Sequence, residues 1–396
     1  MNKKDKIRAI AGASLLQCAL IGILVNTSGT LFSPIVAEYG FAMTRLSAFN
    51  IIKSAAGALT GAAATALMYR SDLRKYMLGV VAVICAGFVM LTVGANTVLW
   101  YIAPALVSFS STVGIIAVPY ILGQRLSKGA GSATGFAMAF SGVGGVVFNP
   151  IAAFLIQKTG WRVTTLILCA VTMAFALAGL WLLFGKEKAS DRADAVSTKK
   201  TDRKEKIDSG MRMRFVLCTL SLLCGTVCTA FVPFVNLYAE SLGYSAVVAA
   251  TVASAVMAGN IGGKLLFGVL CDVVGTWKAM LASGVCVFAG LLGMMLFSKA
   301  LGLLLVCAAL FGMSYSLATI AVSKCAQAAY GTELAKRFTG IHTGITCAAG
   351  AVGSLGIGVI HDATASFVPV IGIIAAVVAV SFTATWITKN QVEKKR

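Results

Sequence analysis

Apolar residues run along this chain in stretches long enough to cross a lipid bilayer, and short breaks rich in charged or turn-forming residues separate them. A helix needs about 20 residues to cross the hydrocarbon layer, because it rises about 1.5 Å per residue. The alternation of runs and breaks predicts twelve membrane-spanning helices. They lie near residues 9–36, 46–69, 76–95, 99–123, 132–156, 163–185, 214–239, 246–270, 279–298, 301–329, 338–360 and 367–388.

The break between the sixth and seventh spans is longer than the others. The stretch "KEKASDRADAVSTKKTDRKEKIDSGMRMR" (186–214) has almost no apolar content, so it cannot bury a core, and we expect a disordered or loosely helical linker. The chain is therefore predicted to hold a six-helix bundle over 1–185, a basic cytoplasmic linker over 186–213 and a second six-helix bundle over 214–396.

The two predicted bundles resemble each other in sequence. "FSPIVAEYG" (32–40) has a counterpart in "FVPFVNLYAESLG" (231–243), and "GSATGFAMAFSGVGG" (131–145) has one in "GIHTGITCAAGAVGS" (340–354). The pattern predicts an all-α membrane protein built from two pseudo-symmetric six-helix units. Transporters built from such repeats bind their substrate near the middle of the membrane, between the repeats.

Composition agrees with the membrane assignment. Of the 396 residues, 58% are hydrophobic and 12% are charged, whereas soluble domains carry about 25% charged residues. A soluble protein of this length could not hide so much apolar surface. The first apolar run lacks a small-residue cleavage pattern, so we expect a membrane span there and not a removable signal peptide.

The net charge of +19 orients the protein in the membrane. Lysine and arginine concentrate at both termini, in the linker and in alternate loops, which places those segments in the cytoplasm by the positive-inside rule. We therefore expect a multi-pass protein of the cytoplasmic (inner) membrane with both termini inside, and no nucleic-acid partner. The eleven cysteines show no CxxC pair and indicate packing residues, not a metal site.

One loop motif resembles the signature of the major facilitator superfamily. In "GVLCDVVGTWK" the positions that match are Gly268, Asp272, Gly275 and Lys278, and twelve spans in two halves with a long middle loop are that family's layout. The resemblance implies that Asp272 braces the cytoplasmic gate. An acid can accept hydrogen bonds at the positive start of a neighbouring helix, here the fifth span, with Arg125 within reach. The alternative is a solvated loop acid.

A narrower resemblance is to the oxalate/formate antiporter and monocarboxylate porter group. The eighth span, "NIGGKLLFGVLCD", carries Asn260, Gly263, Lys264, Gly268 and Asp272 at that group's pattern positions. The group's arginine is a lysine here, which keeps the charge but loses the planar fork that binds a carboxylate through two hydrogen bonds. The resemblance implies a carboxylate substrate held at Lys264.

The ionisable residues inside the spans are cationic or neutral. They are Lys53, Lys264, Lys324 and His342, and none of the fourteen acids falls in the middle of a span. A charge at the centre of the bilayer costs about 2.5–3.5 kcal/mol on insertion scales, so each such residue needs a partner. A small organic anion would supply the missing negative charge.

Each of these residues has a structural alternative. Lys53 and Lys324 could extend their ammonium groups to the membrane surface, as Lys264 could in part. His342 could be a packing histidine or could carry a proton, since histidine alone has an unperturbed pKa near neutrality. Asn26 in the first span is a further substrate-binding candidate beside Asn260.

These observations predict a secondary active transporter of a small mono- or dicarboxylate, working by antiport or by proton symport. Other possibilities are an exporter of neutral or anionic drugs or metabolites, and a transport-inactive sensor. No nucleophile–base set, metal cluster or GxxxxGK[ST] loop is visible, so we expect no enzyme activity, no cofactor and no direct use of ATP. We expect the protein to act as a monomer in the lipid bilayer.

Overall fold

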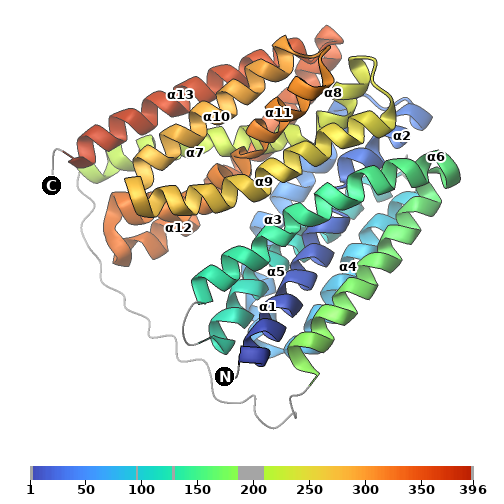
Figure 1. The fold of residues 1–396 in the computed structure, drawn as a ribbon, viewed down its shortest axis with the longest axis horizontal. Helices are drawn as coiled ribbons and strands as arrows, with labels where there is room; N and C mark the ends of the chain where they lie inside the picture. The colour runs from blue at the N-terminus through green and yellow to red at the C-terminus, as the bar shows by residue number, and fades with distance from the viewer. Residues whose placement is uncertain (1–2, 95–96, 127–129, 186–208, 394–396) are drawn as a thin grey trace.

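The computed structural model describes residues 3–94, 97–126, 130–185 and 209–393, which are helical with short connections and contain no strand within those ranges. Figure 1 shows the arrangement. The helices are α1 (Lys3–Gln17), the π-helical turn η1 (Cys18–Ile23), α2 (Ser28–Tyr39), α3 (Met43–Arg70), α4 (Leu73–Gly94), α5 (Leu99–Arg125), α6 (Ala130–Phe184), α7 (Ser209–Phe231), the 3₁₀ turn η3 (Val232–Phe234), α8 (Val235–Ser241), α9 (Ala246–Val274), α10 (Thr276–Leu296), α11 (Leu301–Gly312), α12 (Ser314–Thr364) and α13 (Val368–Glu393).

Within the described residues, ten helical stretches are long and apolar enough to cross a membrane. One of them, Ala133–Phe184, contains both the fifth and the sixth predicted spans, and the backbone leaves the helical conformation inside it at Gly160 (φ 77°, ψ 163°). The second predicted span lies in α3, which is not among the ten. The ten stretches are therefore consistent with the twelve predicted spans. Most of the predicted linker, 186–208, lies outside the described residues.

The first predicted span lies within one candidate span, Lys4–Tyr39, but its helix contains an interruption that the sequence did not predict. After α1 the chain makes the π-helical turn η1, and in the turn that follows it the backbone amide of Asn26 donates to the carbonyl of Ile21, five residues earlier, at 3.0 Å. The hydroxyls of Thr27 and Ser28 then donate to backbone carbonyls three or four residues before them. Hydroxyl side chains that bond to the backbone compete with the helical ladder, and they explain the interruption here.

The seventh span is interrupted as well, at Pro233 in η3. The two interruptions lie against each other: a Cβ placed on Gly29 would be 3.0 Å from the carbonyl oxygen of Pro233. A Cβ contact of this length is tighter than most that proteins contain, so the glycine favours the close approach of the two backbones. The interruptions therefore form part of the contact between the two halves of the chain.

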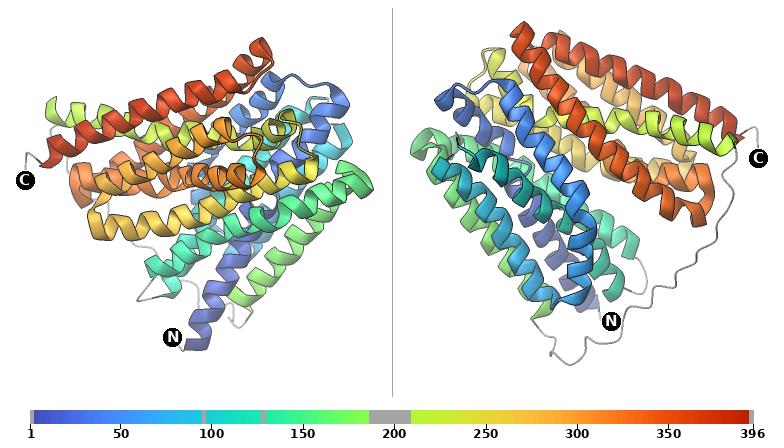
Figure 2. Two further views of the ribbon diagram at one scale, coloured as in Figure 1. Left: turned by 45° about the horizontal axis from the view of Figure 1, so that its top comes forward. Right: turned by 180° about the vertical axis from the view of Figure 1, so that it is seen from behind.

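The helices form two groups. Helices α1–α6 pack against one another, as do α7–α13, and the main contacts between the groups join α6 to α9 and α3 to α12. The groups meet at the end that carries α2, α8 and the bend of α6, and they diverge toward the end where both termini lie (Figures 1 and 2). We call these the closed end and the diverging end. By the charge pattern, the closed end is the predicted outer end.

The largest buried apolar cluster contains residues of both groups. From the first group, the ring of Phe32 lies 4.8 Å from that of Phe49 and 5.6 Å from that of Trp100. From the second, Phe231 lies 6.1 Å from Phe311. This shared core holds the two groups together at the closed end.

Candidate functional site

Helix α9 faces the other group along one stripe of residues. A Cβ placed on Gly145 of α6 would lie 3.0 Å from the sulfur of Met257, and one on Gly142 would lie 2.5 Å from the side chain of Ile261. Residues four and three apart share one face of a helix, so Lys264 continues this stripe. Lys264 thus lies on the α9 face that meets the other group, one turn beyond the last close contact and toward the diverging end.

The side chain of Lys264 is half-buried and has an aromatic neighbour. Its ammonium nitrogen lies 5.8 Å from the centre of the Tyr315 ring, which α12 supplies. An ammonium over an aromatic face is attracted electrostatically, but that attraction does not replace a counter-ion. Among the described residues, no carboxylate pairs with Lys264.

Asn260 precedes Lys264 by one helical turn and is 1% exposed. Its amide nitrogen lies 4.0 Å from the sulfur of Met257, and its amide oxygen has no hydrogen-bond partner among the described residues. A buried acceptor without a partner costs about 1–3 kcal/mol. Asn260 and Lys264 together therefore offer an unused acceptor and a cation at neighbouring positions of α9.

Lys53 is half-buried on α3 and lies one turn after Phe49. The Phe49 ring packs against Phe32 of α2, so this face of α3 points toward the interrupted first span. Within the described part of the chain Lys53 forms no ion pair. Lys53 and Lys264 are thus similar in burial and charge, one in each group of helices.

Lys324 differs from the other two lysines. Its ammonium nitrogen lies 3.8 Å from a carboxylate oxygen of Asp272, and the two side chains are 38% and 79% exposed. Arg125, which the sequence placed within reach of Asp272, lies with its guanidinium 5.0 Å from the centre of the Phe184 ring. The structure therefore brings Asp272 together with a lysine of its own group.

The other motif residues lie around the end of α9. Gly275 joins α9 to α10 with a φ of 86°, a conformation that residues with a side chain rarely adopt. Lys278 is exposed in the first turn of α10. A Cβ on Gly268 would meet no atom within 4 Å. The geometry thus explains why the motif has a glycine at position 275.

His342 is fully buried between α7 and α12. Its Nδ1 lies 3.2 Å from the hydroxyl of Thr219 and its Nε2 lies 3.2 Å from the hydroxyl of Tyr330. The ring stacks on Phe215 with the centroids 4.7 Å apart. Both nitrogens therefore have partners, which is the arrangement of a packing histidine.

Asn26 binds α6 through its side chain. Its amide nitrogen donates to the carbonyl of Ser141 at 2.6 Å, and the amide of Asn149 reaches the carbonyl of Asn26 at 3.4 Å. The side chain holds the interrupted first span against the neighbouring helix. Asn26, which we expected at the substrate, thus uses its amide nitrogen to bind the protein's own backbone.

A polar cluster at the closed end was not predicted from the sequence. The hydroxyl of Thr30 donates to the side-chain oxygen of Asn149 at 2.8 Å and lies 2.9 Å from the side-chain amide of Asn236. All three residues are buried, and Asn236 comes from the second group. Asn149 stands out in the sequence because it precedes Pro150 within a span. Uncharged polar residues are otherwise common in spans, so no pattern in the sequence distinguishes Thr30 and Asn236.

Comparison with known proteins identifies the fold and the family. The family model described as Major Facilitator Superfamily matches residues 13–354. Among solved structures, a crystal structure of a mutant of the nucleoside transporter NupG is similar with a TM-score of 0.72 and 14% sequence identity, over 97% of this chain and 99% of that one. At this identity the similarity shows the fold alone. Comparison with curated proteins finds no match.

Proposed function

Because this chain belongs to the major facilitator superfamily, we propose that it is a secondary active transporter that carries a small organic anion across the cytoplasmic membrane. Two six-helix halves, 1–185 and 214–396, would alternate in exposing a site between them. The observation that carries the proposal is the place of Lys264: it lies on the α9 face toward the other half without a carboxylate partner among the described residues.

The ammonium group of Lys264 needs a replacement for the hydration that it loses when it leaves water. Removing an ammonium group from water is unfavourable by several kcal/mol unless an opposite charge and hydrogen bonds replace the lost solvation. The carboxylate of a bound substrate would supply both to Lys264. The unused acceptor of Asn260, one turn away, could then take a hydrogen bond from a hydroxyl or a protonated group of the same molecule.

The number of mid-span lysines that pair with no described acid bears on the charge of the substrate. Among the mid-span lysines, Lys324 lies near Asp272, whereas Lys53 and Lys264 pair with no acid in the described ranges and are the candidates for binding an anion, one from each half. If both bind the cargo, a dicarboxylate would neutralise both and would link the two halves in the occluded state. If Lys264 acts alone, a monocarboxylate is expected.

The surroundings of His342 favour exchange as the mode of coupling. Hydroxyl groups occupy both ring nitrogens and an aromatic ring covers one face, so His342 is poorly placed to pass a proton to the substrate. In the exchange mode, an empty site with unpaired cations resists closure, so the carrier returns across the membrane only when it is loaded. Proton symport is the other outcome of the test below.

The test is efflux of labelled carboxylates from liposomes that contain the purified protein. We compare wild type with Lys264→Met, and we use Lys299→Met, which changes a lysine outside the helices, as a matched control. The proposal expects efflux that external carboxylate accelerates, that persists in Lys299→Met and that is lost in Lys264→Met. Carboxylate efflux that Lys264→Met leaves unchanged would contradict the assigned role of this lysine.

A second candidate is transport of a neutral solute. One solved structure with a similar fold is titled a nucleoside transporter. The ring of Tyr315 and the unused acceptor of Asn260 could hold an uncharged, hydroxyl-bearing molecule through stacking and hydrogen bonds. Flux of labelled nucleoside without any carboxylate flux would favour this alternative.

A further inference from the structure

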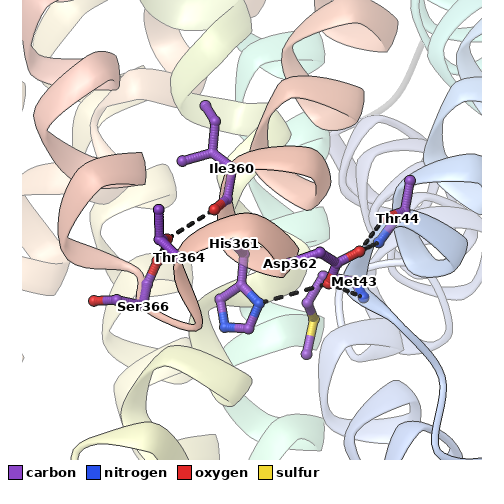
Figure 3. Close-up of polar contacts among 7 residues, drawn as sticks. All are labelled: Met43, Thr44, Ile360, His361, Asp362, Thr364 and Ser366. Carbon is purple, nitrogen blue, oxygen red and sulfur yellow. Dashed lines mark hydrogen bonds and ion pairs between the residues drawn. The ribbon is translucent and has the colours of Figure 1, made fainter.

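Asp362, near the end of α12, binds the start of α3. Its two carboxylate oxygens accept hydrogen bonds from the backbone amides of Met43 at 2.8 Å and Thr44 at 2.9 Å, and the hydroxyl of Thr44 donates to it as well (Figure 3). The first amides of a helix have no partner within that helix. The carboxylate therefore satisfies two of the unpaired donors of α3.

Helix α3 has no cap of its own. The residue at its N-cap position is Ala42, whose side chain cannot accept a hydrogen bond. Serine, threonine, aspartate and asparagine are the usual residues at this position because their side-chain oxygens bind the free amides. Asp362 supplies that oxygen from another helix, and its negative charge is also attracted by the positive start of the α3 dipole.

The contact crosses between the two groups of helices, because α3 belongs to the first group and α12 to the second. Gly358, one turn before Asp362, makes the close approach possible. A Cβ on Gly358 would lie 2.9 Å from the carbonyl oxygen of Met43 and 2.9 Å from the Cα of Thr44. The fit between the two helices thus depends on a glycine and an acid that lie four residues apart.

Charged neighbours of this contact are few within the described residues. His361 lies beside it on the same helix, with its Nδ1 3.8 Å from an oxygen of Asp362, and its ring packs 4.3 Å from that of Phe367. Elsewhere at the closed end, the hydroxyl of Ser33 donates to Glu240 across the two groups. That second contact joins two side chains, whereas Asp362 holds a helix terminus.

We propose that Asp362 is a positioning residue that keeps the closed end shut by capping α3, and that this cap breaks each time the transporter opens at that end. The inference rests on the alternating-access part of the proposed function and does not depend on the anion. In the present structure Asp272, the acid of the loop motif at the diverging end, is 79% exposed beside Lys324. The family resemblance implies that Asp272 binds the start of α6 when that end closes. Each end would then have one acid that caps a helix of the opposite half, and the two caps would form in alternation.

Hydrogen exchange followed by mass spectrometry tests this proposal on the full chain without substrate. We compare wild type with Asp362→Asn, which keeps the shape of the side chain but removes its charge and one acceptor. Backbone amides in 41–48 and 355–366 should exchange about tenfold faster in the variant, because charge-assisted hydrogen bonds are lost. Amides near the diverging end, in 268–274 and 320–328, should exchange more slowly, because that end closes more often.

The opposite signs at the two ends distinguish a gate from a merely destabilised protein. Faster exchange at both ends, or no change at either end, would overturn the proposal. Asp362→Glu retains the carboxylate, so its amide exchange rates at the two ends should be closer to those of wild type than the rates of Asp362→Asn. A glutamate variant whose exchange rates change as much as those of the asparagine variant would also contradict the proposal.

A second variant on the same helix keeps the test independent of one residue. Gly358→Ala inserts a methyl group against Met43 and Thr44 and should shift exchange at the two ends in the same directions as Asp362→Asn. Lys299→Gln changes a residue outside this contact and serves as the control; its amide exchange rates at both ends should equal those of wild type. Since no substrate is added, failure of the anion proposal would leave these results unaffected, and the two proposals fail separately.

Discussion

The ammonium nitrogen of Lys324 lies 3.8 Å from a carboxylate oxygen of Asp272, and both residues belong to the second group of helices. The pair removes Lys324 from the set of lysines that lack an acid within the described residues. Ion pairs exposed to water contribute about 0–1 kcal/mol. Asp272 can therefore change partners at little cost, which suits an acid that is expected to serve a gate.

We expect Lys324→Gln to change the balance between the two states of the transporter more than its affinity for substrate. The substitution should change thermal stability by less than about 1 kcal/mol, because the pair is exposed. Substrate dissociation constants for Lys324→Gln, Lys264→Met and wild type would check this. If Lys324→Gln weakened binding as strongly as Lys264→Met, Lys324 would be a binding residue instead.

Asn260→Leu should separate stability from function. The amide oxygen of Asn260 is buried and has no hydrogen-bond partner among the residues that the structure describes. An apolar side chain of similar size should therefore leave the thermal stability of the substrate-free protein unchanged or raise it by up to about 1–2 kcal/mol. Transport should fall at the same time, because the acceptor is lost. Thermal unfolding and liposome flux on the same preparation measure both effects. A loss of stability with full transport would show that Asn260 is a packing residue.

His342→Ala should destabilise the protein by about 2–4 kcal/mol, because it opens a cavity and removes the hydrogen bonds between the imidazole ring and the hydroxyls of Thr219 and Tyr330. If exchange is the mode of coupling, a proton gradient imposed across wild-type liposomes should not drive accumulation of substrate. Proton-driven accumulation that His342→Gln abolishes, with the protein still folded, would contradict this prediction and establish symport.

Substitution of two glycines of α9 by alanine should change the stability of the protein in different ways. A Cβ on Gly259 would collide with the backbone carbonyl of Ala309 on α11, so Gly259→Ala should destabilise the protein by about 1–3 kcal/mol. A Cβ on Gly268 would meet nothing within 4 Å, and alanine favours a helix over glycine by up to about 1 kcal/mol. Gly268→Ala should therefore unfold at the same temperature as wild type or higher. Equal melting temperatures for both variants would contradict the packing argument.

The sequence by itself determined the all-helical membrane fold and the positions of most spans. Hydrophobic length is a local property, and each run of about 20 apolar residues must form its backbone hydrogen bonds internally in lipid. The loop motif around Asp272 pointed to the family that the comparison then identified. The interruption of the first span was missed, because the bonds made by Thr27 and Ser28 depend on side-chain geometry and not on hydropathy.

Only the tertiary structure decided which polar residues have partners. Lys324, Lys264 and Lys53 look alike in sequence, yet Lys324 lies beside an acid from a different helix, and the other two pair with no acid in the part of the chain that the structure describes. His342 finds its two hydroxyl partners on separate segments, and Asp362 caps a helix whose start lies more than three hundred residues earlier in the chain. Hydrogen bonds and ion pairs act over a few ångströms, so they depend on which helices lie side by side. That arrangement follows from the packing of the whole chain.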